Sequence, residues 1–295
     1  MDTRELGYFL AVVDHDGFGR AAEHLHLAQP SLSQAIKALE RRLGTPLFHR
    51  TSKGVVLTEA GRALIGPARQ VIRDLQTAGE TIDAVKGLRH GRVDIASMPS
   101  PAIDPLSGMI SRFSAHAPEV TVNVMATPTV ERTLEAVRSG SCEIGVLGTP
   151  HALHEADLAT RRLGSQRFVV ISSADDDTPG DLIDRGELAG RKTIVGPRGT
   201  GMRLLIEEMR DSGIDLSVVV ETEHREAILT LVADGVGSAV LTDGWAPVAR
   251  RMGLRVFDLD PPAYLHLWMI TRKAPATPAA RHFWDMHDDG GDERG

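Results

Sequence analysis

Residues 29–44 read QPSLSQAIKALERRLG and carry the clearest helical pattern in the N-terminal part of the chain. Leucine and isoleucine recur there at intervals of four, three and four residues, which places them on one face of a helix. These apolar residues are Leu32, Ile36, Leu39 and Leu43. Pro30 stands at the first helical position, where proline is tolerated, and Gly44 ends the pattern. The spacing predicts a helix from Pro30 to Leu43 with one buried face.

The opposite face of this helix is polar. It carries hydroxyl, amide and cationic side chains, namely Ser31, Ser33, Gln34, Lys37 and Arg41. In a helix-turn-helix, the second helix enters the major groove of DNA with its N-terminal residues against the base edges, while cations hold the phosphates. The face fits this use. An ordinary surface helix often carries the same residue types, so composition alone leaves both interpretations open.

Shorter elements are expected on either side of this helix. Apolar residues at helical spacing predict one helix that ends near residue 17 and a second over about 20–25. After Gly44, β-like residues flank a turn-like tetrapeptide at 51–54. We expect a two-stranded wing there, whose tip presents Arg50 and Lys53 to the DNA backbone.

A heptad pattern follows over about 58–88. Apolar residues alternate steps of four and three at Leu64, Ala68, Val71, Leu75, Ala78, Ile82 and Val85. One helix cannot bury such a stripe alone, so the pattern predicts dimerisation through the same helix of a second subunit. Pro67 removes one backbone hydrogen bond, and a bend or local irregularity is expected there. Gly87 and Gly91 are interpreted as a hinge.

Beyond residue 91, β-like and helical stretches alternate, which predicts parallel sheets with helices on both faces. The expected strands are Val93–Met98, Val120–Ala126, Ile144–Leu147, Phe168–Ile171, Thr193–Val195, Val218–Val220, Ala239–Leu241 and Leu265–Ile270. The expected helices are Leu106–His116, Val130–Ser139, Met202–Asp211 and Arg225–Asp234. The acidic run at 175–177 is expected to be a solvated loop. The segment is long enough for one such domain or two smaller ones.

Composition excludes several protein classes. The 295 residues are 42% hydrophobic and 25% charged, which fits neither a disordered nor a membrane-embedded chain. The single cysteine, Cys142, excludes an internal disulfide, and a lone thiol suits a reducing compartment. The first residues lack a signal-peptide core, and no apolar run approaches the roughly 18 residues that spanning a membrane requires. The sequence therefore predicts a cytoplasmic protein.

Net charge differs between the two parts of the chain. The whole chain carries −7, which alone argues against nucleic-acid binding. Residues 1–90 hold 12 basic and 10 acidic side chains, whereas 91–295 hold 21 and 30. Only the first segment is therefore suited to phosphate.

The N-terminal residues resemble the DNA-binding segment of LysR-type transcriptional regulators. The matching positions are Phe9, Ala21, Ala22, Leu25, Gln29, Pro30, Ser31, Ser33, Leu39, Glu40, Leu43, Gly44, Leu47, Phe48, Arg50, Leu57, Thr58 and Gly61. The later chain resembles the family's effector domain more loosely, through Phe113, Pro118, Gly140, Gly196, Pro197, Gly235 and Gly237.

This resemblance implies an α/β protein with an N-terminal all-α winged helix-turn-helix over 1–58. A dimerising linker helix and hinge would follow over 59–90. Residues 91–295 would form a periplasmic-binding-protein-like effector domain, with lobe one at about 92–161 and 266–288 and lobe two at about 162–265. A small-molecule cleft would lie between the lobes.

The resemblance also assigns DNA contacts. Gln29 and Gln34 are candidates for base edges, because an amide pairs bidentately with adenine. The candidates for phosphate contacts, or for shaping the start of the helix, are Pro30, Ser31, Ser33, Lys37, Arg50 and Lys53. The family usually has a small hydroxyl residue just after the glycine that opens the second helix, where this chain reads Gly17-Phe18-Gly19-Arg20. Arg20 is a possible substitute.

For the effector, hydroxyls and backbone amides at strand-to-helix junctions favour an organic anion. By resemblance, Ser100 and Thr129 would hold a ligand carboxylate. The other candidates are Thr127, Gly148 and Thr149 near the same edge, Arg198, Thr200 and Arg203 as a countercharge region, and Gly237 from below. The alternative interpretation is that these are helix caps and turns.

The expected partners are double-stranded promoter DNA, a small-molecule effector and further copies of the chain, as a homodimer and a homotetramer of two dimers. RNA polymerase is a further candidate, and no membrane, cofactor or metal is expected. The glycine-rich residues 196–201 lack the ending of a P-loop, and no nucleophile elbow or zincin spacing supports an enzyme. The competing hypothesis is a solute-binding or enzymatic α/β protein with an incidental N-terminal helical domain. It would need an export signal or catalytic residues.

Overall fold

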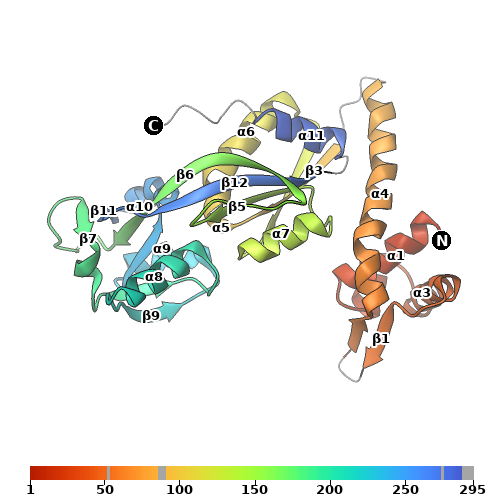
Figure 1. The fold of residues 1–295 in the computed structure, drawn as a ribbon, viewed down its shortest axis with the longest axis horizontal. Helices are drawn as coiled ribbons and strands as arrows, with labels where there is room; N and C mark the ends of the chain where they lie inside the picture. Colours follow the sequence, from red (N-terminus) through yellow and green to blue (C-terminus); the bar gives the residue numbers. More distant parts are fainter. Residues whose placement is uncertain (52–53, 86–90, 274–275, 288–295) are drawn as a thin grey trace. The chain divides into compact units, whose positions relative to one another are not determined.

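The computed structural model describes residues 1–51, 54–85, 91–273 and 276–287. Two compact units divide near Gly91, and each is considered by itself (Figure 1). Within the described residues, no helix combines the length and apolar character needed to cross a membrane.

The N-terminal unit is a helical bundle with a two-stranded antiparallel wing, as the sequence predicts. Its elements are α1 (Thr3–Asp14), α2 (Phe18–His24), α3 (Gln29–Leu43), β1 (Phe48–Thr51), β2 (Gly54–Leu57) and α4 (Glu59–Val85). The Asp2 and Glu5 side chains form a capping box at the start of α1. Gly44 ends α3 in the left-handed conformation, with φ 71°.

The core of this unit is built from the apolar faces of the first three helices. Phe9, Leu32, Ile36 and Leu39 are at most 1% exposed, which confirms the buried face of α3. The start of α4 is fixed to the residues before the wing, because the Thr58 hydroxyl donates to the Pro46 carbonyl at 2.8 Å and accepts from the Gly61 amide at 2.9 Å. A Cβ at Gly61 would lie 2.2 Å from the Leu47 carbonyl oxygen. Only glycine permits this approach.

The second unit is an α/β structure with a long mixed sheet. Its strands are β3 (Gly91–Ser97), β4 (Val120–Ala126), β5 (Ile144–Thr149), β6 (Leu158–Ser172), β7 (Leu182–Asp184), β8 (Lys192–Val195), β9 (Ser217–Glu221), β10 (Ser238–Thr242), β11 (Arg255–Asp260) and β12 (Tyr264–Arg272). Its helices are α5 (Pro99–Pro101), α6 (Ser107–His116), α7 (Val130–Arg138), α8 (Gly201–Asp211), α9 (Arg225–Ala233), α10 (Ala246–Arg251) and α11 (Pro278–Asp285), with short helical turns η1 (Ala102–Leu106), η2 (Arg185–Leu188) and η3 (Asp243–Trp245).

The expectation of purely parallel sheets is wrong. The strand order is β4-β3-β5-β12-β6-β10-β8-β9, with β11 and β7 to one side. The pairs β3–β5, β8–β9 and β8–β10 are parallel, but β12 is antiparallel to both β5 and β6. The long strands β6 and β12 lie side by side through the unit (Figure 1).

These two strands divide the unit into two lobes with separate cores. The first part of β6 pairs with the end of β12 in lobe 1, which also holds β3 to β5, α6, α7 and α11. The last part of β6 pairs with β10 and β11 in lobe 2, which also holds β7 to β9 and α8 to α10. Phe113 of α6 packs on Phe283 of α11, with ring centroids 5.1 Å apart, whereas Phe168 and Phe257 belong to the lobe 2 core.

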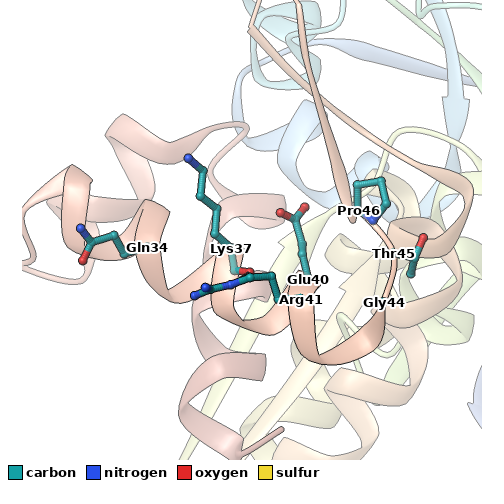
Figure 2. Close-up of a pocket in the computed structure, with 7 residues that line it drawn as sticks. All are labelled: Gln34, Lys37, Glu40, Arg41, Gly44, Thr45 and Pro46. Atoms are coloured by element: carbon teal, nitrogen blue, oxygen red, sulfur yellow. Dashed lines mark hydrogen bonds between the residues drawn. The ribbon is translucent and has the colours of Figure 1, made fainter.

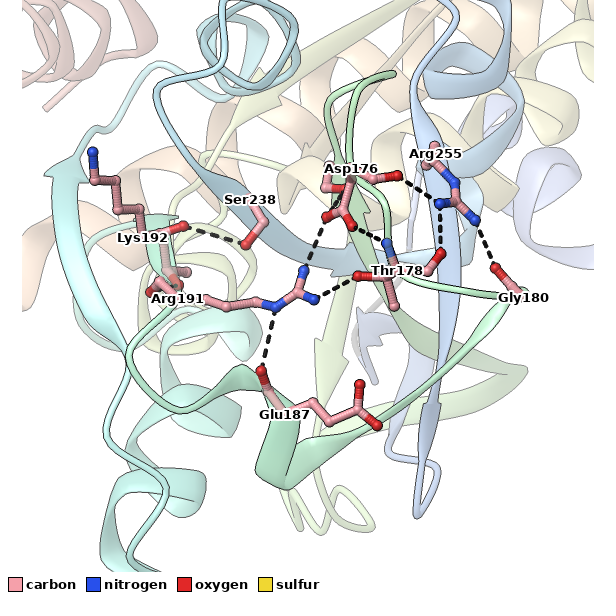
Figure 3. A network of polar contacts seen from close by, with 10 residues as sticks. Asp176, Thr178, Gly180, Glu187, Arg191, Lys192, Ser238 and Arg255 are labelled. Carbon is pink, nitrogen blue, oxygen red and sulfur yellow. Dashed lines mark hydrogen bonds and ion pairs between the residues drawn. The ribbon is translucent and has the colours of Figure 1, made fainter.

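The acidic run is held by two arginines rather than solvated along its whole length. Asp176 is 13% exposed, and its carboxylate accepts from Arg191 at 2.9 Å. Arg191 also donates to the Thr178 hydroxyl at 2.6 Å, while Arg255 donates to the Asp176, Thr178 and Gly180 carbonyls (Figure 3). The network fixes the loop between β6 and β7 to β11 and to Arg191, the residue before β8.

Candidate functional sites

The polar face of α3 is accessible. Gln29, Pro30, Ser31, Gln34 and Lys37 are exposed and Ser33 is partly buried. Their side chains have no hydrogen-bond partner among the described residues. Ala28 caps the helix in an extended conformation without a side-chain hydrogen bond, and its carbonyl oxygen accepts from the Ser31 amide at 2.9 Å and the Leu32 amide at 3.2 Å.

A groove on the same surface is lined by Gln34, Lys37, Arg41, Thr45 and Pro46, together with Glu40 and Gly44. Gln34, Lys37 and Arg41 project from successive turns of α3 (Figure 2). Glu40 has a structural role, because its Oε1 atom accepts from the Leu47 amide at 2.8 Å and the Phe48 amide at 3.2 Å. This carboxylate fixes the beginning of the wing relative to the exposed face of α3.

The structure describes the other three candidate cations to different extents. Arg20 donates to the His15 carbonyl at 2.6 Å and the Asp16 carbonyl at 2.7 Å, so it caps the end of α1. Arg50 lies in β1 opposite Val55, but its side chain is outside the described part. Lys53 lies wholly outside the described residues. The assignment of these three residues to phosphates stays a prediction.

The heptad residues of α4 separate into a covered and an exposed group. Ala68 is 1% exposed and Leu64 packs beside it against the core of the N-terminal unit. Val71, Leu75 and Ile82 are 41%, 59% and 56% exposed, and Ala78 is exposed as well. The side chain of Val85 is outside the described part. The exposed stripe therefore begins at Val71, one helical turn beyond the covered residues.

A cleft separates the two lobes of the second unit, and we call it the interlobe cleft. It is lined by Met98, Pro99, Ser100 and Pro101 from lobe 1, Gly201, Met202, Arg225, Leu241 and Thr242 from lobe 2, and Phe168 and Leu265 from the connecting strands. Its free volume is about 10 Å³, room for about one water molecule. A larger molecule enters only when the lobes separate or lining side chains move.

Contacts between the lobes border this cleft. The Gln166 side-chain amide on β6 donates to the Asp104 carbonyl of lobe 1 at 2.7 Å. Across the cleft, a Cβ on Gly199 would lie 3.3 Å from the Thr129 methyl group, so the loop before α8 closely approaches lobe 1. Burial raises the pKa of Asp243 at the start of η3. The contacts described between the lobes are therefore the hydrogen bond from Gln166 and the close approach of the glycine-containing loop before α8.

The structure brings some predicted effector residues to the cleft and engages others elsewhere. Ser100 lines the cleft, and Thr129 lies beside it as the residue before α7. The Thr127 hydroxyl is bonded to the Thr133 hydroxyl at 2.7 Å. The Thr149 hydroxyl donates to the His151 carbonyl at 2.5 Å and accepts from Trp268 at 2.9 Å.

The predicted lobe 2 residues are similarly divided. Thr200 caps α8, with its hydroxyl donating to the Pro197 carbonyl at 2.9 Å. Arg203 is buried and ion-paired with Glu207 and Glu221, each at 3.1 Å. Arg198 is exposed. Their assignment to a ligand stays a prediction.

Two predicted glycines have packing roles. A Cβ at Gly148 would lie 2.6 Å from the Leu265 side chain, and one at Gly237 would lie 2.7 Å from the Lys192 carbonyl oxygen. Both positions therefore require glycine for the close approach of neighbouring elements.

Arg225 and Thr242 line the cleft but were not among the sequence candidates. Arg225 is the first residue of α9 and Thr242 the last of β10, so both stand at ends of elements next to a loop. The rule that identified Ser100 and Thr129, a polar residue where a strand gives way to a helix, also applies to them. This signal is present in the sequence, but only the fold shows that these two junctions lie in the cleft.

Two family models match the chain. The model described as "Bacterial regulatory helix-turn-helix protein, lysR family" matches residues 3–62, and the model described as "LysR substrate binding domain" matches residues 86–290. The HTH-type transcriptional regulator IlvR of Caulobacter vibrioides is 29% identical over 283 residues, which is 94% of this chain and 94% of that protein.

Solved structures share the fold. A full-length OxyR variant from Pseudomonas aeruginosa has a TM-score of 0.72 at 23% identity, covering 98% of this chain and 94% of that one. Full-length CbnR complexed with its target DNA has a TM-score of 0.69 at 21% identity, covering 99% and 100%. The expected helix-turn-helix and two-lobed α/β fold is confirmed, and the competing hypothesis of a solute-binding protein or enzyme is not favoured.

Proposed function

The chain belongs to the LysR family of DNA-binding transcriptional regulators, and from this we propose how its own residues perform that function. It binds double-stranded promoter DNA as a homo-oligomer through α3 and the wing. A small organic anion in the interlobe cleft modulates this binding. The single observation that carries the proposal is the exposed polar face of α3, whose side chains have no partner within the described residues.

The DNA contacts divide by chemistry. Gln29 and Gln34 read base edges, because an amide can both donate to and accept from adenine. Ser31, Ser33 and Lys37, with Arg50 and Lys53 of the wing region, contact phosphates and position the helix without specifying sequence. Residues 1–58 form the DNA-binding domain, 59–90 the linker and 91–295 the effector domain.

Dimerisation uses α4. Its exposed stripe of Val71, Leu75, Ala78 and Ile82 is continuous over three helical turns, which supports pairing with the same helix of a second subunit. A tetramer of two such dimers needs a further interface that this stripe does not supply.

Regulation follows from differential binding. The interlobe cleft has room for about one water molecule, which supports a ligand-bound state in which the lobes are further apart than in the structure described. A ligand shifts an equilibrium only by its difference in affinity for the two states. The effector therefore changes lobe separation and, through the subunit contacts, the spacing of the DNA-binding domains.

A gel-shift titration against the DNA directly upstream of the protein's own gene tests the proposal. We expect a sequence-preferring complex that weakens steeply with salt. Lys37→Ala removes one phosphate contact per subunit and should reduce the slope of log K against log salt by about 1.8 for a dimer. Gln34→Ala should instead alter the preferred sequence.

Lys192→Ala is the matched control, because Lys192 is an exposed lysine in the second unit, on β8. It should leave the slope unchanged. Absence of any salt-sensitive, sequence-preferring complex would count against promoter binding, and an unchanged slope for Lys37→Ala would remove that residue from the interface.

A further inference from the structure

The Arg225 guanidinium stands in the interlobe cleft without a counter-charge. It is partly buried, and it has neither a hydrogen bond nor an ion pair to any described residue. It lies against Gly196, where a Cβ would approach its Nη2 atom to 2.8 Å. The absence of a side chain at Gly196 leaves the space that this guanidinium occupies.

Such a cation is energetically unusual. Burial lowers the pKa of Arg225, which means that its charged form is desolvated without compensation. Arg203, in the first turn of α8 in the same lobe, is buried but has two carboxylates at 3.1 Å. Buried charges are normally paired in this way, because removing an unpaired charge from water is strongly unfavourable. An anion from outside the chain would provide the missing partner.

A second group in the cleft independently lacks a partner. Thr242 is 1% exposed, and its hydroxyl oxygen is fully buried without a hydrogen bond. A buried hydroxyl in this state is unfavourable, and a ligand oxygen could accept a hydrogen bond from it. The α8 and α9 N-termini, at Gly201 and Arg225, add positive potential to the same cleft.

The rest of the lining limits what the anion can be. Apart from Ser100, Arg225 and Thr242, the side chains are apolar and include Met98, Phe168, Met202, Leu241 and Leu265. One cation fits one negative charge, because a second carboxylate would be desolvated among these side chains without a partner. The remainder of the ligand must therefore be compact and apolar.

We propose that Arg225 is the specificity-determining residue of the interlobe cleft and pairs with the carboxylate of a small monocarboxylate that has an apolar body. The guanidinium fork binds the carboxylate bidentately, and the Thr242 hydroxyl donates a further hydrogen bond to it. This inference rests on the proposed function of the cleft as the effector site. It adds the chemical class of the effector and the residue that recognises it.

Isothermal titration of the full-length protein tests this with phenylacetate and 3-methylbutanoate, each compared with its neutral amide. We expect the wild type to bind at least one acid and to discriminate against the matching amide by about tenfold or more. Arg225→Gln should lower the affinity for that acid by about tenfold or more and abolish the discrimination between acid and amide. Arg225→Lys should retain part of this discrimination, since lysine keeps the charge but loses the bidentate geometry.

Two further variants separate recognition from stability. Thr242→Val keeps the shape of the side chain and should lower the affinity for the acid by a smaller factor than Arg225→Gln does. Arg250→Gln removes an exposed arginine on α10, outside the cleft, and should change nothing. Thermal unfolding without ligand checks that each variant is folded, and a gel shift without ligand checks that DNA binding is retained.

Three outcomes would overturn the assignment if DNA binding persists. They are equal affinity of the wild type for acid and amide, undiminished acid binding by Arg225→Gln, and no binding of either acid. If the wild type does not bind DNA in the gel shift, the proposed function itself is refuted.

Discussion

We expect Leu75→Gln to weaken the dimer that forms through α4. Leu75 is 59% exposed in the single chain and lies midway along the exposed stripe, between Val71 and Ile82. Pairing with a second α4 would bury the remaining surface of this side chain. Glutamine keeps the helical propensity and approximate size of leucine but places an amide in the apolar seam.

The magnitude follows from the exposed fraction. Full burial of a leucine contributes roughly 1.5–3 kcal/mol, so burial of the remaining 59% contributes about 1–2 kcal/mol per subunit. A homodimer contains two copies, and the loss is then about 2–4 kcal/mol. This corresponds to a dimer dissociation constant raised roughly 30- to 900-fold.

Sedimentation equilibrium over a range of concentrations measures this constant directly. Leu182→Gln is a matched control, because Leu182 is 58% exposed but lies on β7 in the second unit. We expect the control to sediment as the wild type does. Should Leu75→Gln remain as tightly dimeric as the wild type while still folded, the stripe on α4 would not be the dimer seam.

Two further predictions concern stability. Gly61→Ala would place a Cβ 2.2 Å from the Leu47 carbonyl oxygen and should lower the free energy of unfolding by about 1–3 kcal/mol, whereas Gly66→Ala in the same helix meets nothing within 4 Å and should be neutral or stabilising in urea titrations. For Asp176, burial raises the pKa, but hydrogen bonds from Ser172 and Thr178 and the charge of Arg191 outweigh it and lower the pKa from 3.8 to about 2. The carboxylate therefore stabilises the fold fully above about pH 4, by about 1–2 kcal/mol after allowance for solvent screening, and this contribution disappears as the pH falls through 2. Urea unfolding of Asp176→Asn should show that deficit at pH 6 and a shrinking one towards pH 2; a deficit independent of pH would contradict the assignment.

The N-terminal unit is predictable from sequence because its determinants are local. The spacing of Leu32, Ile36 and Leu39 specifies which face of α3 is buried, and Gly44 supplies the conformation that ends the helix. The same periodicity identifies the stripe on α4. It does not show that Leu64 and Ala68 are covered within the same subunit, since that depends on how α4 packs against α1.

The second unit shows where local patterns are insufficient. Each expected strand overlaps an observed one, but strand direction in a sheet is a property of pairs distant in sequence. Residues 158–172 form one strand that serves both lobes, and only its buried last third, from Phe168, is apolar enough to be recognised. The preceding part, up to Arg167, is largely polar and only partly buried while it pairs with β12. Short strands such as β7 and β11 likewise depend on partners rather than on their own sequence.

Arg203 and Arg225 of lobe 2 show the same limit at the level of a site. Both lie in the first turn of a helix, where the positive end of the helix dipole repels a cation and local structure does not favour one. Arg203 has Glu207 at i+4, a pair visible in the sequence, and Glu221 completes its neutralisation from β9. Arg225 has Leu229 at i+4, and its neighbour Glu226 is bonded to His224 instead. Sequence spacing could therefore have marked Arg203 as already paired and Arg225 as unpaired. Only the fold shows that the unpaired cation lies in the interlobe cleft.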